Sequence, residues 1–176
     1  MNSALFLDRD GVINIDYGHV YKKENFDFID NIFDIVSFAK DLGYLVIIIT
    51  NQAGIAKGLY TEKDFQRLML WVAHQFEINN GKIDKTYFCP FHKNGVVKKY
   101  TKDSIDRKPQ PGMILKACKE FNINPKTSVL IGDKASDIKA ANSSLIGKSV
   151  YFGQDKCSTA YKSISSLLDV KKELNF

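Results

Sequence analysis

The chain has 176 residues, 44% of them hydrophobic, which fits one globular domain and excludes a largely disordered chain. Its three widely spaced cysteines exclude a disulfide framework, and no apolar run can span a membrane, so we expect a cytoplasmic protein that does not bind membranes. The net charge of +5 admits a nucleic-acid or an anionic small-molecule partner, but the basic residues are dispersed and form no aromatic-interleaved stripe.

The first predicted strand, Ala4–Leu7, begins almost at once, so we expect no secretion signal. It runs directly into two acids separated by one residue, Asp8 and Asp10. Burying an unpaired carboxylate is costly, so these acids must meet water, a metal or a substrate. Residues i and i+2 of an extended segment point to the same side, which places both acids to face one ligand.

The next elements alternate between helices and strands. Helical spacing of apolar residues predicts a helix over residues 32–42, with Gly43 as its C-terminal cap. A buried strand is expected at Leu45–Thr50, and Thr61 can then cap a second helix. The buried face of that helix is expected to comprise Phe65, Leu68, Met69, Val72 and Phe76. Trp71 and His74 lie off this stripe, and we expect His74 at the surface.

A third strand is predicted at Thr86–Cys89, and the stretch Pro90–Pro111 that follows has neither helical nor strand period. Long loops of this kind in compact domains are usually functional. Pro111 can open a third helix. One face of it is expected to carry Ile114, Leu115, Cys118 and Phe121.

The last predicted elements are a strand at Ser128–Gly132, a helix at Ser136–Ser144, a strand at Ser149–Phe152 and a helix at Thr159–Leu168. Alternating strands and helices predict an α/β fold with a mainly parallel sheet, formed as a single domain over residues 1–176.

Polar residues follow the predicted strands, and ligands of open α/β sheets bind at the carboxyl ends of strands. These residues are Asp8 and Asp10, Thr50 to Gln52, Asp133 and Lys134 with Asp137 nearby, and Arg107 and Lys108 from the long loop. Such a set suits phosphoryl transfer. A carboxylate can attack phosphorus, and a second acid can protonate the leaving oxygen. Carboxylates hold Mg²⁺, while Lys and Thr side chains neutralise phosphate oxygens.

Four stretches carry a resemblance to a known family. "DRDGVIN", "TNQAGIAKGLY", "RKPQPGM" and "GDKASDIKAA" resemble, in order, the four motifs of haloacid dehalogenase-type phosphatases. In their longer forms they are similar to one branch, the D-glycero-D-manno-heptose 1,7-bisphosphate phosphatases and the related histidinol-phosphatases. Four motifs in order over residues 4–152 are far more specific than a lone Asp-x-Asp.

The resemblance implies a Rossmann-like three-layer α/β/α sandwich. Such proteins often carry a cap domain over the site, but no segment here is long enough for one, so we expect no large cap domain. It implies that Asp8 is the nucleophile and a Mg²⁺ ligand, and that Asp10 is the general acid/base whose backbone carbonyl also binds Mg²⁺. Asp133 would complete the metal site, and Asp137 would support it from behind. Thr50 and Lys108 would stabilise the transferred phosphoryl group. Substrate contacts are implied for Asp16, Tyr17, Gly18, His19, Asn51, Gln52, Ala53, Arg107 and Lys134.

The sequence departs from the family pattern at one loop. Relatives commonly carry a zinc loop with Cys-x-His followed by Cys-x-Cys, but here Cys89 and His92 are followed by Ser104 and Asp106. A Cys–His pair cannot fill a closed tetrahedral zinc site, and Ser is a poor neutral ligand. We therefore expect structural zinc to be absent.

The resulting hypothesis is a Mg²⁺-dependent phosphatase that removes one phosphate from D-glycero-D-manno-heptose 1,7-bisphosphate through an aspartyl-phosphate intermediate. A histidinol-phosphate phosphatase is the alternative, because it shares every catalytic residue. A nucleic-acid-binding or end-processing protein on the same fold is a third reading, motivated by the pI of about 9.0 and opposed by the missing basic stripe. We expect a monomer whose partner is a small sugar phosphate.

Overall fold

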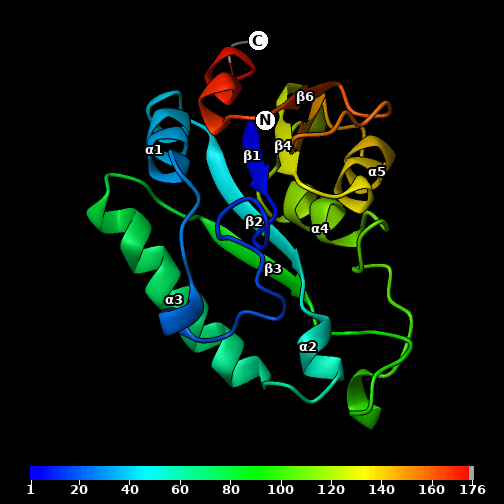
Figure 1. The fold of residues 1–176 in the computed structure, drawn as a ribbon. Helices are drawn as coiled ribbons and strands as arrows, with labels where there is room; N and C mark the ends of the chain where they lie inside the picture. The colour runs from blue at the N-terminus through cyan, green and yellow to red at the C-terminus, as the bar shows by residue number, and fades with distance from the viewer. Residues whose placement is uncertain (175–176) are drawn as a thin grey trace.

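The computed structural model describes residues 1–174, which form a six-stranded, all-parallel sheet with helices on both faces (Figure 1). The strands are β1 (Ala4–Leu7), β2 (Leu45–Asn51), β3 (Lys85–Cys89), β4 (Val129–Gly132), β5 (Lys148–Phe152) and β6 (Lys162–Ile164). They are arranged in the order β3-β2-β1-β4-β5-β6. The two central neighbours, β1 and β4, are therefore far apart in the sequence.

Two layers of helices cover the sheet. The helices are α1 (Ile32–Asp41), α2 (Ala53–Ala56), α3 (Glu62–Ile78), α4 (Gly112–Glu120) and α5 (Ala135–Ser143). Helices α1 and α3 lie on one face, and α4 and α5 lie on the other (Figure 1). Strand β1 serves both cores, because Leu5 and Leu7 pack on the α1/α3 side while Ala4 and Phe6 pack on the α4/α5 side. Burial on both faces explains its uninterrupted apolar sequence.

Most of the predicted elements are confirmed. All five residues of the predicted α3 stripe are buried. The side chain of Thr61 accepts from the backbone N–H of Asp64, and the Asp64 carboxylate accepts from the backbone N–H of Thr61. Gly43 follows α1 with a φ of +80°. The capping box gives hydrogen-bond acceptors to N–H groups that the first turn of the helix leaves unpaired. A glycine with positive φ turns the chain away after the last turn.

The helix predicted at Thr159–Leu168 is wrong. Ile164, Leu167 and Leu168 have helical spacing, but Lys162–Ile164 forms β6 beside β5, and a 3₁₀ helix follows at Leu167–Lys172. The open edge of β5 supplies hydrogen-bond partners that a helix would not use, so tertiary pairing overrides the local pattern. Ile164 and Leu167 are buried in this arrangement.

Leu115 differs from the prediction, and Trp71 makes a contact that the prediction did not include. Leu115 is 47% exposed, because Met113 rather than Leu115 faces the sheet beside Ile114. Trp71 lies off the α3 stripe as expected, yet it packs edge-on against the ring of Phe26. The ring of Phe26 belongs to the long segment after β1, so Trp71 fixes that segment to α3.

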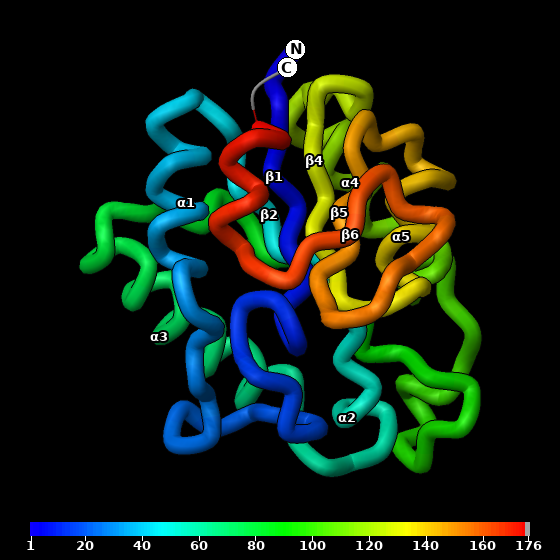
Figure 2. The backbone as a smooth tube through the Cα atoms, turned by 45° about the horizontal axis from the view of Figure 1, so that its top comes forward, coloured from blue at the N-terminus to red at the C-terminus, as the bar shows by residue number. Residues whose placement is uncertain are grey.

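Three loops gather at the carboxyl end of the sheet (Figure 2). They are the segment between β1 and α1, the turn that carries α2, and the segment between β3 and α4. Within residues 1–174 these insertions consist of loops and short helices, without a separate cap domain. No helix in the same residues is long and apolar enough to cross a membrane.

The capping box of α3 gives a stability prediction. We expect Thr61→Ala to lower the free energy of unfolding by about 1 kcal/mol, because the backbone N–H of Asp64 loses its side-chain acceptor. Urea unfolding followed by circular dichroism measures the change. Thr61→Ser keeps the hydroxyl and should stay close to the unsubstituted protein. Equal losses in both variants would show that the cap contributes nothing.

Candidate active site

A cavity of about 410 Å³ opens at the carboxyl end of the sheet, between the three loops. It is lined by Asp8, Asp10, Asp16, Gly18, His19, Thr50, Asn51, Gln52, Ala53, Tyr60, Arg107, Lys108, Lys134, Ser136 and Asp137. Every residue named from the sequence is in this set except Tyr17 and Asp133. The strand ends and the long loop thus meet at one place, because the carboxyl ends of parallel strands lie at the same edge of the sheet.

A buried lysine lies at the bottom of the cavity. The Nζ of Lys108 lies 2.8 Å from Asp8 Oδ1 and 2.7 Å from Asp137 Oδ1, and it donates to the backbone carbonyl of Ile49 at 2.9 Å. Burial acts to lower the pKa of Lys108, but the two carboxylates outweigh it and raise that pKa, so the ammonium stays charged. The Asn51 side chain fixes the Lys108 backbone by hydrogen bonds to both its N–H and its carbonyl.

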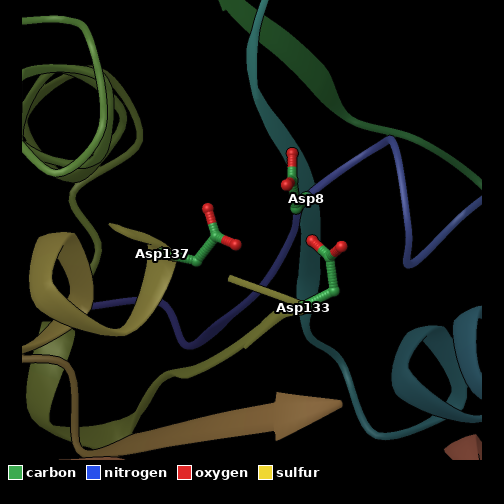
Figure 3. A group of neighbouring side chains, drawn as sticks. All are labelled: Asp8, Asp133 and Asp137. Atoms are coloured by element: carbon green, nitrogen blue, oxygen red, sulfur yellow. The ribbon is translucent and has the colours of Figure 1, made fainter. Parts of the chain in front are cut away.

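Three carboxylates gather above this ammonium, carried by the end of β1, the end of β4 and the first turn of α5 (Figure 3). Ligand oxygens of Asp8, Asp133 and Asp137 all lie within 4.8 Å of one another. Burial raises the pKa of Asp8 to about 7 and the pKa of Asp133 to about 6. Asp133 Oδ1 is buried without a hydrogen-bond partner. Such a group of hard oxygen donors fits a divalent cation such as Mg²⁺.

A glycine makes room for this group. Gly11 has a φ of +93°, and a Cβ atom built there would lie 2.1 Å from Asp133 Oδ2. Any side chain at this position would strain the turn after β1 and displace Asp133. The glycine that follows the two acids in the sequence is therefore required by the carboxylate of Asp133, directly after β4.

Asp10 faces the cavity with 15% of its side chain exposed. Its Oδ2 accepts from Arg9 and from Gln52, and its Oδ1 accepts from Asn14. The hydroxyl of Thr50 is also buried and accepts from Gln52 at 2.8 Å. Asp10 and Thr50 are thus held by a network that the sequence motifs alone do not show.

The rim of the cavity carries charged groups from two loops. Lys134 Nζ lies 2.9 Å from Asp16 Oδ2 and 3.6 Å from Asp133 Oδ2. Burial acts to raise the pKa of Asp16, but hydrogen bonds from Lys134 and the Gly18 N–H lower it overall. His19 Nε2 lies 3.3 Å from Lys57 Nζ. The Arg107 guanidinium donates to the Phe91 carbonyl at 3.4 Å.

Tyr17 lies outside the cavity. Its ring is exposed, and its hydroxyl donates to Asp27 at 2.8 Å. Three residues of the site were not found from the sequence, namely Arg9, Tyr60 and Ser136. Arg9 and Tyr60 lie inside quoted motifs, but nothing in the letters shows that both side chains turn inward to reach Gln52.

The residues at the expected zinc loop have other partners. The thiol of the buried Cys89 lies 3.9 Å from the Phe91 carbonyl, and His92 Nδ1 accepts from the Asn94 N–H. Asp106 forms an ion pair with Lys116. Among residues 1–174, the Cys, His, Asp and Glu side chains close enough to share a metal ion do not include Cys89, His92 or Asp106.

Comparisons with known proteins agree with this geometry. The HAD-hydrolase-like family model matches residues 105–144. The chain is 49% identical over 146 residues to D-glycero-alpha-D-manno-heptose-1,7-bisphosphate 7-phosphatase of Burkholderia mallei, covering 83% of this chain and 77% of the relative. It is 44% identical over 140 residues to D-glycero-beta-D-manno-heptose-1,7-bisphosphate 7-phosphatase of Haemophilus influenzae, covering 80% of this chain and 76% of the relative.

A solved structure shows the same fold. D,D-heptose 1,7-bisphosphate phosphatase from B. bronchiseptica, complexed with magnesium and phosphate, superposes with a TM-score of 0.83 at 19% identity. The superposition covers 98% of this chain and 97% of that one.

The raised pKa values give a prediction for metal binding by the free protein. A carboxylate must lose its proton to bind Mg²⁺, so affinity should rise with pH. With the pKa of Asp8 at about 7, its deprotonation alone predicts about tenfold tighter binding at pH 8 than at pH 6. Calorimetric titration with Mg²⁺ at the two pH values measures this ratio. Asp8→Asn should remove most of the pH dependence, and equal affinities in the unsubstituted protein would contradict the assignment.

Proposed function

The chain belongs to the haloacid dehalogenase-like family that contains the D-glycero-D-manno-heptose-1,7-bisphosphate 7-phosphatases, and on this basis we propose that it removes the 7-phosphate of that sugar. One observation carries the proposal. Asp8 and Asp10 line one cavity above a charged, buried lysine, which is the arrangement that phosphoryl transfer to a carboxylate requires.

The reaction follows from the contacts of Asp8. Its Oδ1 is engaged by Lys108 Nζ and by the Arg9 backbone N–H, so Oδ2 is the oxygen left to attack phosphorus. A bond forms between Oδ2 and phosphorus, the bond from phosphorus to the sugar oxygen breaks, and Asp10 gives that oxygen a proton. Water then attacks phosphorus and gives a proton to Asp10, the bond between phosphorus and Oδ2 breaks, and phosphate leaves with Asp8 and Asp10 restored.

Charge stabilisation comes from the groups around Asp8. Lys108 would neutralise charge on the transferred phosphoryl oxygens, and the Thr50 hydroxyl would donate a hydrogen bond to them. Mg²⁺, held by Asp8, Asp133 and the backbone carbonyl of Asp10 with Asp137 close behind, would offset the repulsion between the carboxylates and the incoming phosphate. The residues fit this ion because the orphaned Asp133 oxygen and its two neighbours are the ligand type that Mg²⁺ prefers.

The substrate class follows from the cations that remain. Lys108 is committed to the reacting phosphate, whereas Arg107 and Lys134 line the same cavity and would contact the rest of the substrate, with Lys134 exchanging its ion pair to Asp16 for the substrate. A guanidinium can hold a phosphate or sugar oxygens through two parallel hydrogen bonds. We also propose that a monomer is sufficient for activity.

The decisive experiment compares substrates on one enzyme preparation. We expect kcat/KM for heptose 1,7-bisphosphate, tested as both anomers, to exceed kcat/KM for histidinol phosphate. The ammonium and imidazole of histidinol phosphate would meet Arg107 and Lys134. Higher efficiency on histidinol phosphate would reject the sugar substrate and leave the phosphatase chemistry intact.

The nucleophile gives a second prediction. We expect Asp8→Asn to reduce turnover below detection while circular dichroism and the melting temperature show a folded protein, because an amide does not attack phosphorus. Asp10→Asn should lower kcat by about 10²–10⁴-fold through loss of the proton donor. Substantial activity in a folded Asp8→Asn variant would rule out the covalent route.

We also propose that the protein works without structural zinc. The support is the presence of Ser104 and Asp106 in place of two thiolates, together with an alternative anchor for the loop. The N–H groups of Val96 and Val97 both donate to the Ala56 carbonyl, which ties the loop to α2.

Elemental analysis of the purified protein tests this proposal. We expect far less than one zinc per chain, and a zinc-selective chelator should leave the melting temperature unchanged. One zinc per chain that is lost only on unfolding would contradict it.

A further inference from the structure

Arg9 has the largest fully buried side chain in the described residues. Its guanidinium lies between the rings of Phe26 and Phe65, with centroids 5.9 and 5.8 Å from its central carbon. A buried charge is costly unless it is paired and hydrogen-bonded. The guanidinium of Arg9 must therefore find hydrogen-bond acceptors within the protein.

Those hydrogen bonds lead to the cavity. Arg9 Nε and Nη2 both donate to Asp10 Oδ2, at 3.1 and 2.7 Å. Nη1 donates to the Val20 carbonyl at 2.8 Å, and Nη2 also donates to Gln52 Oε1 at 3.1 Å. One buried cation thus contacts the expected proton donor and a glutamine beneath the phosphoryl site.

Arg9 fixes which way the Gln52 amide points. A guanidinium can only donate, so the atom of Gln52 facing it must be the oxygen, which also accepts from the Tyr60 hydroxyl. The NH₂ group then faces Asp10 Oδ2 at 3.2 Å and Thr50 Oγ1 at 2.8 Å. The reversed amide would place an oxygen against the Asp10 carboxylate and a donor against Arg9.

This orientation determines what the Thr50 hydroxyl can do. Because Gln52 donates to Thr50 Oγ1, the hydroxyl proton of Thr50 is not used toward Gln52 and is left for an acceptor in the cavity. The same glutamine and Arg9 hold the Asp10 carboxylate from one side. Arg9 therefore determines both the direction of the Thr50 hydroxyl proton and the orientation of the Asp10 carboxylate.

We propose that Arg9 is a positioning residue for phosphoryl transfer, acting through Gln52 to present the Thr50 hydroxyl as a donor and to hold Asp10 toward the leaving oxygen. This inference rests on the proposed function. It assigns Arg9 a role that differs from filling the core between Phe26 and Phe65. A core-filling role would change stability without distinguishing one substrate from another.

Leaving-group dependence separates the two roles. A sugar alkoxide needs a proton from Asp10 as it departs, whereas p-nitrophenolate leaves without one. We expect Arg9→Met to lower kcat/KM for the sugar phosphate at least tenfold more than for p-nitrophenyl phosphate, with both measured at saturating Mg²⁺. The matched control is Phe65→Leu, which disturbs the packing around Arg9 and leaves its hydrogen bonds in place. That variant should lower both rates by the same factor.

A second variant guards against misfolding of Arg9→Met. Gln52→Glu is nearly isosteric and keeps an acceptor for Arg9, but it loses the donor to Thr50 and places an acid against Asp10. It should show the same selective loss, and Tyr60→Phe should show a smaller one. Equal factors for both substrates in Arg9→Met and Gln52→Glu would overturn the role of Arg9 in holding Asp10. An unchanged rate on p-nitrophenyl phosphate in both variants would overturn its role in presenting the Thr50 hydroxyl, which contacts the phosphoryl group of either substrate.

The result does not depend on the identity of the sugar. If the unsubstituted enzyme proves to prefer another alkyl phosphate, that ester replaces the heptose in the same ratio. Failure of the heptose assignment appears as a low rate in the unsubstituted enzyme. Failure of the Arg9 proposal appears as an unchanged ratio in the variants.

Discussion

The ion pairs of Lys108 are the interaction on which the site depends. Three carboxylates, Asp8, Asp133 and Asp137, share a small buried space, and one buried ammonium compensates only part of their charge. Lys134 lies 3.6 Å from Asp133 and is half exposed, so water screens its contribution. The remaining negative charge calls for a divalent cation. Without a bound cation the site keeps an excess of negative charge. A divalent cation would balance this charge and so allow an anionic substrate to bind.

The sequence was sufficient for strands β1 to β5 and for most of the residues that line the cavity, because strand ends in a parallel sheet converge on one edge. Asp137 shows that one side chain can serve both the helix and the site. Its Oδ2 accepts from the Lys134 N–H at the start of α5, while its Oδ1 contacts Lys108 in the site. Spacing alone could not reveal that one side chain does both.

The parts that escaped prediction depend on contacts distant in sequence. The alternation of an extended strand directs Arg9 away from Asp8, and only the folded chain shows that it turns back to Asp10 and reaches Gln52, 43 positions away. Strand β6 is three residues long, too short for a period to be recognised, and it exists because β5 offers an edge. Propensity and pattern describe one segment at a time, whereas these features come from pairs of segments.

The strand order has a consequence for how the protein is made. β1 and β4 are neighbours in the sheet, and Ala4 is hydrogen-bonded to Ser128 across 124 positions of the chain. During synthesis the first acid emerges early, yet its partners Asp133 and Asp137 emerge only after most of the chain has left the ribosome. Until then the apolar β1 has one sheet neighbour, β2, and an open edge. The free edge of β1 must not pair with other chains until β4 has been synthesised. The strand order therefore requires that this edge be protected during translation.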